Sequence, residues 1–180
     1  GIAFGIDRLI GAGSPAYALG LLDGEATIDD PDEVMSLSFG SKAAADTDGM
    51  LGDLAIEIFG YGQAEGAGNE NDDPGVINGT PMVANIGRNI LSVAAYSDEN
   101  SLNPQDHIVA PFSSRGPSPG GRKKPDLTAP GVGVMAPVDG SPAFGLVDGT
   151  SFSTPHVAGA MALFAGAGIL DPMAQRAILI

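Results

Sequence analysis

The fold of this chain is decided by Gly149-Thr150-Ser151-Phe152-Ser153-Thr154-Pro155-His156-Val157-Ala158-Gly159. An almost entirely apolar run follows the hydroxyl-rich start, and this pattern predicts a helix over residues 151–165 that is buried on all sides. Pro155 is expected in the first turn, where backbone N–H groups have no intrahelical acceptor. The helix start would direct free N–H groups and positive dipole at Ser151, which stabilises developing negative charge. An ordinary helix N-cap is the alternative interpretation.

The rest of the chain alternates strand and helix patterns, which predicts an α/β fold around a parallel sheet. Apolar residues at helical spacing predict a helix over residues 51–59. Strands are expected at residues 34–39, 89–95 and 132–136, and the mouth of another at residues 65–69.

Four further segments resemble parts of one known family. They read MSLSFG at residues 35–40, AGN at 67–69, APFSSRGP at 110–117 and KPDLTAPG at 124–131. Together with residues 149–159, and in the same order, they resemble the subtilisin-like serine proteases, or subtilases. The resemblance covers most of residues 33–165. It implies a three-layer α/β fold, with a mostly parallel twisted sheet between helices, and the activity of a serine endopeptidase.

The resemblance assigns two catalytic roles. Ser151 corresponds to the nucleophile that forms the acyl-enzyme, and its own backbone N–H is a natural donor to the oxyanion. Asn69 corresponds to the side-chain donor of the oxyanion hole, a task that suits a neutral amide because it does not titrate. A turn residue after Gly68 is the alternative for Asn69.

The resemblance also implies a substrate groove with two walls. One wall is an exposed strand edge onto which a peptide can add as a further strand, formed by Ser36, Leu37, Ser38, Phe39 and Gly40. Missing side chains in the second wall would leave room for the substrate residue before the scissile bond, at Gly66, Ala67 and Gly68. Phe39 stands where the family commonly has leucine, so subsite preference is not carried over. The alternative for residues 34–39 is a plain core strand.

The general base is where the chain departs from the family. Of two histidines, His156 lies five residues after Ser151, about 140° further round a helix, so we expect a buried, hydrogen-bonded structural residue. His107 is expected in a loop. Nothing resembles the family's histidine and aspartate motifs, and the Asp-Gly pairs are typical of turns.

We therefore expect residues 1–180 to be an incomplete subtilase catalytic domain, without its Asp- and His-bearing N-terminal part and its extreme C-terminus. The isolated chain is predicted to be inactive, and the missing part is its expected partner. A catalytically dead peptide-binding module is the alternative. An α/β-hydrolase esterase is excluded because residues 149–153 lack the second glycine of G-x-S-x-G.

Charge and composition limit the partners. The formal net charge is −14, from 22 acidic and 8 basic residues, which argues against nucleic acid as a partner. Proteins or peptides as substrates are implied by the resemblance. Three of the bases, at residues 122–124, are expected in a solvated loop. There is no cysteine and no apolar run long enough to cross a membrane. A secreted location is implied by the resemblance alone.

No cofactor is expected to be required. Many subtilases carry structural calcium, and the run Glu70-Asn71-Asp72-Asp73 offers oxygen ligands. A solvated acidic loop is the favoured interpretation, since the run lacks a recognisable ligand spacing.

Overall fold

The computed structural model describes residues 34–38, 50, 52–54, 56–57, 60, 62–70, 83, 86–118, 121–138, 140 and 142–180. Within them, five strands form one sheet: β1 (Val34–Leu37), β2 (Gly62–Gly66), β3 (Leu91–Ser97), β4 (Ile108–Val109) and β5 (Leu127–Pro130). β1 pairs with β2, β2 with β3 and β3 with β5, all in parallel, while β4 runs antiparallel to β3. The predicted α/β fold with a mostly parallel sheet is confirmed.

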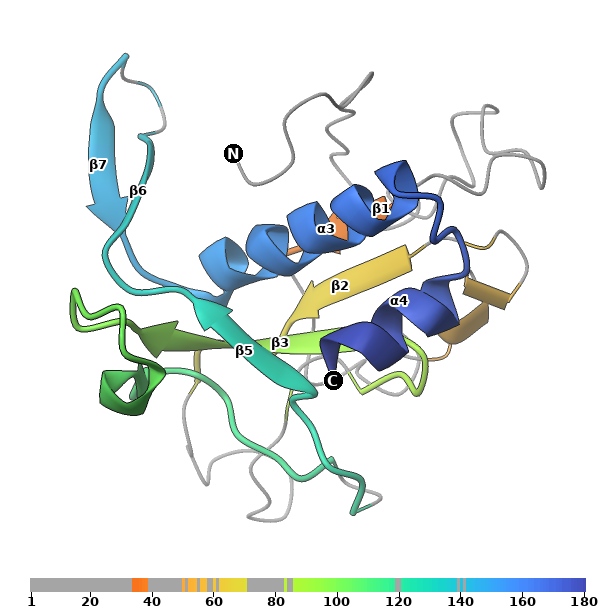
Figure 1. Ribbon diagram of the computed structural model, residues 1–180. Coiled ribbons are helices and arrows are strands. Elements are labelled where there is room, and N and C mark those ends of the chain that lie inside the picture. The colour runs from red at the N-terminus through yellow and green to blue at the C-terminus, as the bar shows by residue number, and fades with distance from the viewer. Residues whose placement is uncertain are drawn as a thin grey trace.

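Two helices cover one face of this sheet (Figure 1), and helical residue Gly52 packs on the other. Helix α3 (Thr150–Gly166) lies along one face, where Ala64, Leu91 and Val93 pack against Val157 and Met161. Helix α4 (Pro172–Leu179) covers the same face: a Cβ on Gly62 would lie 2.6 Å from the Met161 methyl and 2.9 Å from Gln175 Oε1. Gln63, the next residue of β2, points to the opposite face, where helical residue Gly52 packs on it.

The α3-facing residues of β2 are small because helix side chains pack directly on them: a Cβ on Gly66 would lie 3.2 Å from Thr150 Oγ1 and 3.3 Å from Thr154 Oγ1. The side chains on the opposite face are polar although they are buried. Gln63 is 2% and Glu65 4% exposed, and Gln63 Nε2 donates to Glu65 Oε1 at 2.6 Å. A strand of this composition does not have the apolar pattern of a buried strand, which is why its beginning was not predicted.

Several predicted boundaries need correction. The strand predicted at 34–39 ends at Leu37, and the next occupies 62–66 instead of 65–69. The strand predicted at 89–95 is confirmed as β3. Residues 50, 52–54 and 56–57 are helical, in agreement with the predicted 51–59 helix. β5 was missed because prolines at 125 and 130 hide its strand pattern.

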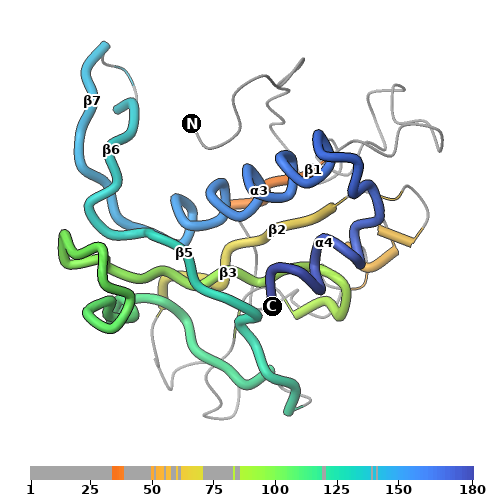
Figure 2. Tube along the Cα trace, viewed as in Figure 1, coloured from red at the N-terminus to blue at the C-terminus, as the bar shows by residue number. Residues whose placement is uncertain are grey.

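In the C-terminal half one predicted strand is confirmed and one predicted burial is wrong. The strand predicted at 132–136 is β6 (Val134–Pro137), but it pairs antiparallel with β7 (Phe144–Val147) in a separate two-stranded sheet. Figure 2 shows this hairpin projecting from the end of the sheet at which α3 begins. Helix α3 is not buried all round, since Leu163 is 45% exposed. No helix in the described part of the chain is long and apolar enough to span a membrane.

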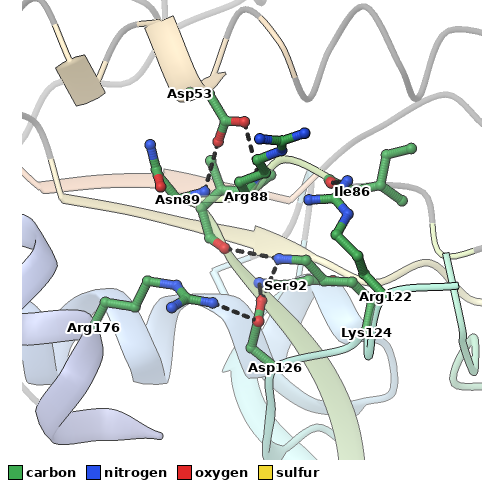
Figure 3. Close-up of polar contacts among 10 residues, drawn as sticks. Asp53, Ile86, Arg88, Asn89, Ser92, Arg122, Lys124, Asp126 and Arg176 are labelled. Carbon is green, nitrogen blue, oxygen red and sulfur yellow. Dashed lines mark hydrogen bonds and ion pairs between the residues drawn. The ribbon is translucent and has the colours of Figure 1, made fainter. Parts of the chain in front are cut away.

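The basic cluster at residues 122–124 is not simply a solvated loop. The side chain of Lys124 is 3% exposed, and its Nζ donates to Ile90 O at 3.0 Å and to Asp126 Oδ2 at 2.5 Å. Asp126 also accepts from the Ser92 N–H at 2.8 Å and from Arg176 of α4 at 2.9 Å (Figure 3). Burial lowers the pKa of Lys124, against the opposing effect of Asp126. This network joins the last helix to the starts of β3 and β5.

Candidate active site

The start of helix α3 is fixed to the sheet through two glycines. Gly131 follows β5 and donates its N–H to Tyr96 O at 3.0 Å, and Gly149 donates its N–H to Gly131 O at 2.8 Å. Gly149 has φ 151° and ψ 154°, a conformation that residues with a side chain rarely adopt. This geometry places Ser151 in the first turn of α3 and at the carboxyl end of the parallel strands, where α/β folds bind ligands.

Asn69 lies against this helix start, on the loop after β2. Its Oδ1 accepts two hydrogen bonds from Thr150, from the N–H at 2.9 Å and from the hydroxyl at 3.0 Å. Because Oδ1 is held twice, the orientation of the amide is fixed and Nδ2 remains on its other side. A Cβ on Gly149 would lie 3.5 Å from that Nδ2. The two hydrogen bonds with Thr150 place Asn69 next to Ser151, the predicted nucleophile, at this edge of the sheet.

Thr150 is the residue that the sequence interpretation missed. Its hydroxyl also accepts from the Gly68 N–H at 3.3 Å, so it holds both Asn69 and the residue before it. Thr150 is only 2% exposed. The carbonyl of Thr150 accepts in turn from the Thr154 hydroxyl at 2.8 Å. A threonine before a serine at a helix start is typical of a cap, and that interpretation concealed its contact with Asn69.

Ser151 is half-buried and makes two hydrogen bonds with Ser38, at the exit of β1. The Ser151 hydroxyl donates to Ser38 O at 3.1 Å, and the Ser38 hydroxyl donates to Ser151 O at 2.9 Å. The two residues are 113 positions apart in the chain. The contact brings the first predicted wall of the groove directly to the predicted nucleophile.

The other predicted groove residues have mixed surroundings. Ser36 is exposed and Leu37 is buried on β1, which is the edge strand among those described; Phe39 and Gly40 lie outside the described residues. In the second wall, the missing side chain of Gly66 accommodates the helix, since a Cβ would lie 3.2 Å from Thr150 Oγ1. Gly66 and Ala67 are buried and Gly68 is half-buried, so Gly68 is the residue of this wall that a ligand can reach.

Both histidines have other partners. His156 is half-buried and its Nδ1 lies 2.7 Å from Phe152 O, which agrees with the expected structural role. His107 follows the short 3-10 helix η3 (Pro104–Asp106), stacks on Tyr96 at 4.7 Å and places Nε2 3.1 Å from Ser101 O. In the described part of the chain, the hydroxyl of Ser151 is therefore held by a backbone carbonyl and not by an imidazole.

The acidic run after Asn69 is described only at its first residue. Glu70 Oε2 accepts from the Ser114 hydroxyl at 3.1 Å, and Asn71, Asp72 and Asp73 lie outside the described residues. No group of three or more histidines and acidic residues able to hold a metal occurs among the described residues.

Comparison with known proteins agrees with this geometry. Residues 11–179 match the Peptidase_S8 description, the subtilase family. The chain belongs to the subtilase family. This subtilase is 33% identical to the serine protease AprX of Bacillus subtilis (strain 168) over 154 residues, which are 75% of the chain and 34% of AprX. It is 29% identical to a subtilisin of Bacillus pumilus over 160 residues, 89% of the chain and 52% of that protein.

Solved structures show the same relationship. The S41 psychrophilic protease superposes with a TM-score of 0.65 at 25% identity, covering 94% of this subtilase and 56% of that chain. Sphericase gives 0.64 at 25% identity, with 94% and 55% covered. The chain thus spans about half of these proteins, and at most about half of the two curated relatives.

Proposed function

We propose that this chain carries the nucleophile and the oxyanion hole of a serine endopeptidase. The observation that supports the proposal is the pairing at the start of α3: Ser151 lies in the first turn, and the Asn69 amide is fixed beside it by two bonds from Thr150. A binding module has no chemical need for a serine and a restrained amide donor at one helix start.

In the proposed reaction, Ser151 Oγ attacks the carbonyl carbon of the substrate while a general base takes the hydroxyl proton. The Asn69 amide and the backbone N–H of Ser151 stabilise the oxyanion of the tetrahedral intermediate. The C–N bond then breaks, the proton passes to the leaving amine, and water hydrolyses the acyl-enzyme. Ser36 to Gly40 and the backbone of Gly68 are the proposed contacts for the substrate peptide.

We propose that the base comes from a segment outside this chain, as part of a larger subtilase catalytic domain. The engagement of His156 with Phe152 and of His107 with Ser101 supports this, as does the coverage of about half of the relatives. The 180 residues alone should therefore retain only the residual acceleration of triad-deficient subtilisin, about 10³–10⁴ over water.

The engagement of His156 and His107 with other partners also favours a second candidate, a subtilase-like module that binds peptides without cleaving them. The full-length protein distinguishes the two. Rapid, stoichiometric labelling of Ser151 by a fluorophosphonate, together with hydrolysis of a chromogenic peptide that Ser151→Ala abolishes, supports the endopeptidase. Peptide binding without labelling supports the module. Rapid labelling of the isolated 180 residues would contradict the proposed external base.

Three subsidiary proposals rest on the family relationship. Proteins or peptides are the substrates, and the net charge of −14 makes nucleic acid an unsuitable partner. We propose that the protein is secreted. No cofactor is proposed for the reaction. Thermal unfolding with and without a chelator tests for structural calcium near Glu70.

A further inference from the structure

The carbonyl group of Ser151 lacks its usual partner within helix α3. In an α-helix this oxygen accepts from the N–H four residues later. That residue is Pro155, which has no N–H. Helix α3 begins at Thr150, so Pro155 lies in its second turn. The sequence had predicted the first turn. The proline therefore removes a hydrogen bond at the residue proposed as nucleophile.

The hydroxyl of Ser38 lies where the missing donor is needed. It donates to Ser151 O at 2.9 Å, while the carbonyl of Ser38 accepts the Ser151 hydroxyl at 3.1 Å. One serine on the exit of β1 thus satisfies the orphaned carbonyl of the nucleophile and also orients its hydroxyl.

We propose that Ser38 is a positioning residue for Ser151, and that its hydroxyl replaces the N–H that Pro155 cannot supply. This proposal rests on the endopeptidase function proposed above. It predicts that Ser38 affects the reactivity of Ser151 more than substrate affinity, because its hydroxyl contacts the backbone of the nucleophile. It also predicts that the need for Ser38 depends on the proline.

The test is a double-mutant cycle in the full-length protein with Ser38→Ala and Pro155→Ala. Removing the hydroxyl should lower kcat and the rate of fluorophosphonate labelling about fivefold to tenfold, as expected for one net hydrogen bond, with KM changed less than about twofold. In the Pro155→Ala background the new N–H satisfies Ser151 O, so Ser38→Ala should then cost less than about twofold. Ser38→Thr keeps the hydroxyl and should recover most of the kcat that Ser38→Ala loses.

Hydrogen exchange tests the hydrogen bond from Ser38 without relying on catalytic activity. Amides of the first two turns of α3 should exchange about fivefold faster in Ser38→Ala, and the difference should disappear when Pro155→Ala is added. If the wild type neither labels nor cleaves, the endopeptidase proposal fails, yet the exchange data still decide the hydrogen bond. An equal cost of Ser38→Ala with and without Pro155, or no cost in labelling and exchange, would overturn the proposal.

Discussion

Asn69 combines two requirements that a side-chain oxyanion donor must meet. The amide must present an N–H to the substrate, and it must not rotate. Thr150 meets the second requirement by donating twice to Oδ1, at 2.9 and 3.0 Å, so that only Nδ2 is left to face a ligand. The restraint comes from Thr150, the residue immediately before Ser151, and it holds the proposed donor and the proposed nucleophile in one rigid unit.

Asn69→Asp tests the donor separately from the restraint. The carboxylate can still accept both bonds from Thr150, but it offers no N–H and adds negative charge where the oxyanion forms. We expect kcat to fall by about 10²–10³ or more, the loss found when the corresponding donor is removed from subtilisin. Asn69→Ala, which loses the two bonds as well, should be similarly slow. Peptide hydrolysis and thermal unfolding measure the two effects, and an Asn69→Asp enzyme with wild-type kcat would contradict the oxyanion role.

At the scale of elements, the entry into helix α3 depends on backbone contact that side chains would prevent. A Cβ on Gly131 would lie 2.2 Å from Ser153 Oγ, 2.6 Å from the Ala95 methyl and 2.9 Å from Gly149 O. Three segments, the end of β3, the end of β5 and the first turn of α3, therefore meet at this glycine. The position of the nucleophile relative to the sheet follows from this close approach.

Gly131→Ala should destabilise the protein by about 1–3 kcal/mol, the usual cost of overpacking, and should slow the labelling of Ser151 because the helix start must move. Gly166→Ala is the matched control in the last turn of the same helix, where a Cβ meets nothing within 4 Å. It should be neutral or stabilising by up to about 1 kcal/mol, since alanine favours helix. Urea unfolding measures both, and equal stability of the two variants would contradict the packing argument.

At the scale of the whole molecule, the buried ion network joins helix α4 to the starts of strands β3 and β5. The Asp126 carboxylate forms ion pairs with Lys124 and Arg176 and accepts a hydrogen bond from the Ser92 N–H, and its side chain is 6% exposed. An interior carboxylate with three donors is well solvated by the protein, whereas the loss of the carboxylate leaves a buried ammonium group without its counter-charge.

Asp126→Asn should therefore lower the free energy of unfolding by about 3–5 kcal/mol. Arg176→Gln is the comparison, because the Arg176 side chain is 24% exposed and its loss leaves Lys124 paired with Asp126. We expect a smaller loss, about 1 kcal/mol, after allowing for screening by solvent. Urea denaturation gives both values. Similar losses in the two variants would mean that burial of Lys124 is not what makes Asp126 necessary.

Lys124 also gives stability a defined dependence on pH. Burial lowers its folded-state pKa below the ordinary value of 10.5. Between these two values the unfolded chain binds more protons than the folded chain, so the contribution of Lys124 to the free energy of unfolding rises with pH across that window. Lys124→Met should remove this rise. Urea midpoints measured from about pH 8 upward compare the two slopes, and identical slopes would contradict the prediction.

The sequence by itself determined the family, the α/β class and helix α3, because hydrophobic periodicity and a run of specific residues are local properties. Residues 149–159 predicted both the helix and Ser151, and residues 67–69 predicted Asn69 beside it. Strand β3 was found for the same reason, since its buried residues are consecutive and, apart from Ser92, apolar.

Only the tertiary structure decided which distant groups satisfy one another. The bond from Ser38 to Ser151 joins residues 113 positions apart, and no local pattern encodes it. The same holds for Thr150 and Asn69, for Lys124, whose burial depends on Asp126 and Ile90, and for β6, whose partner is β7 and not the main sheet. Periodicity fixes the type of an element, whereas pairing depends on which unsatisfied donors and acceptors folding brings together.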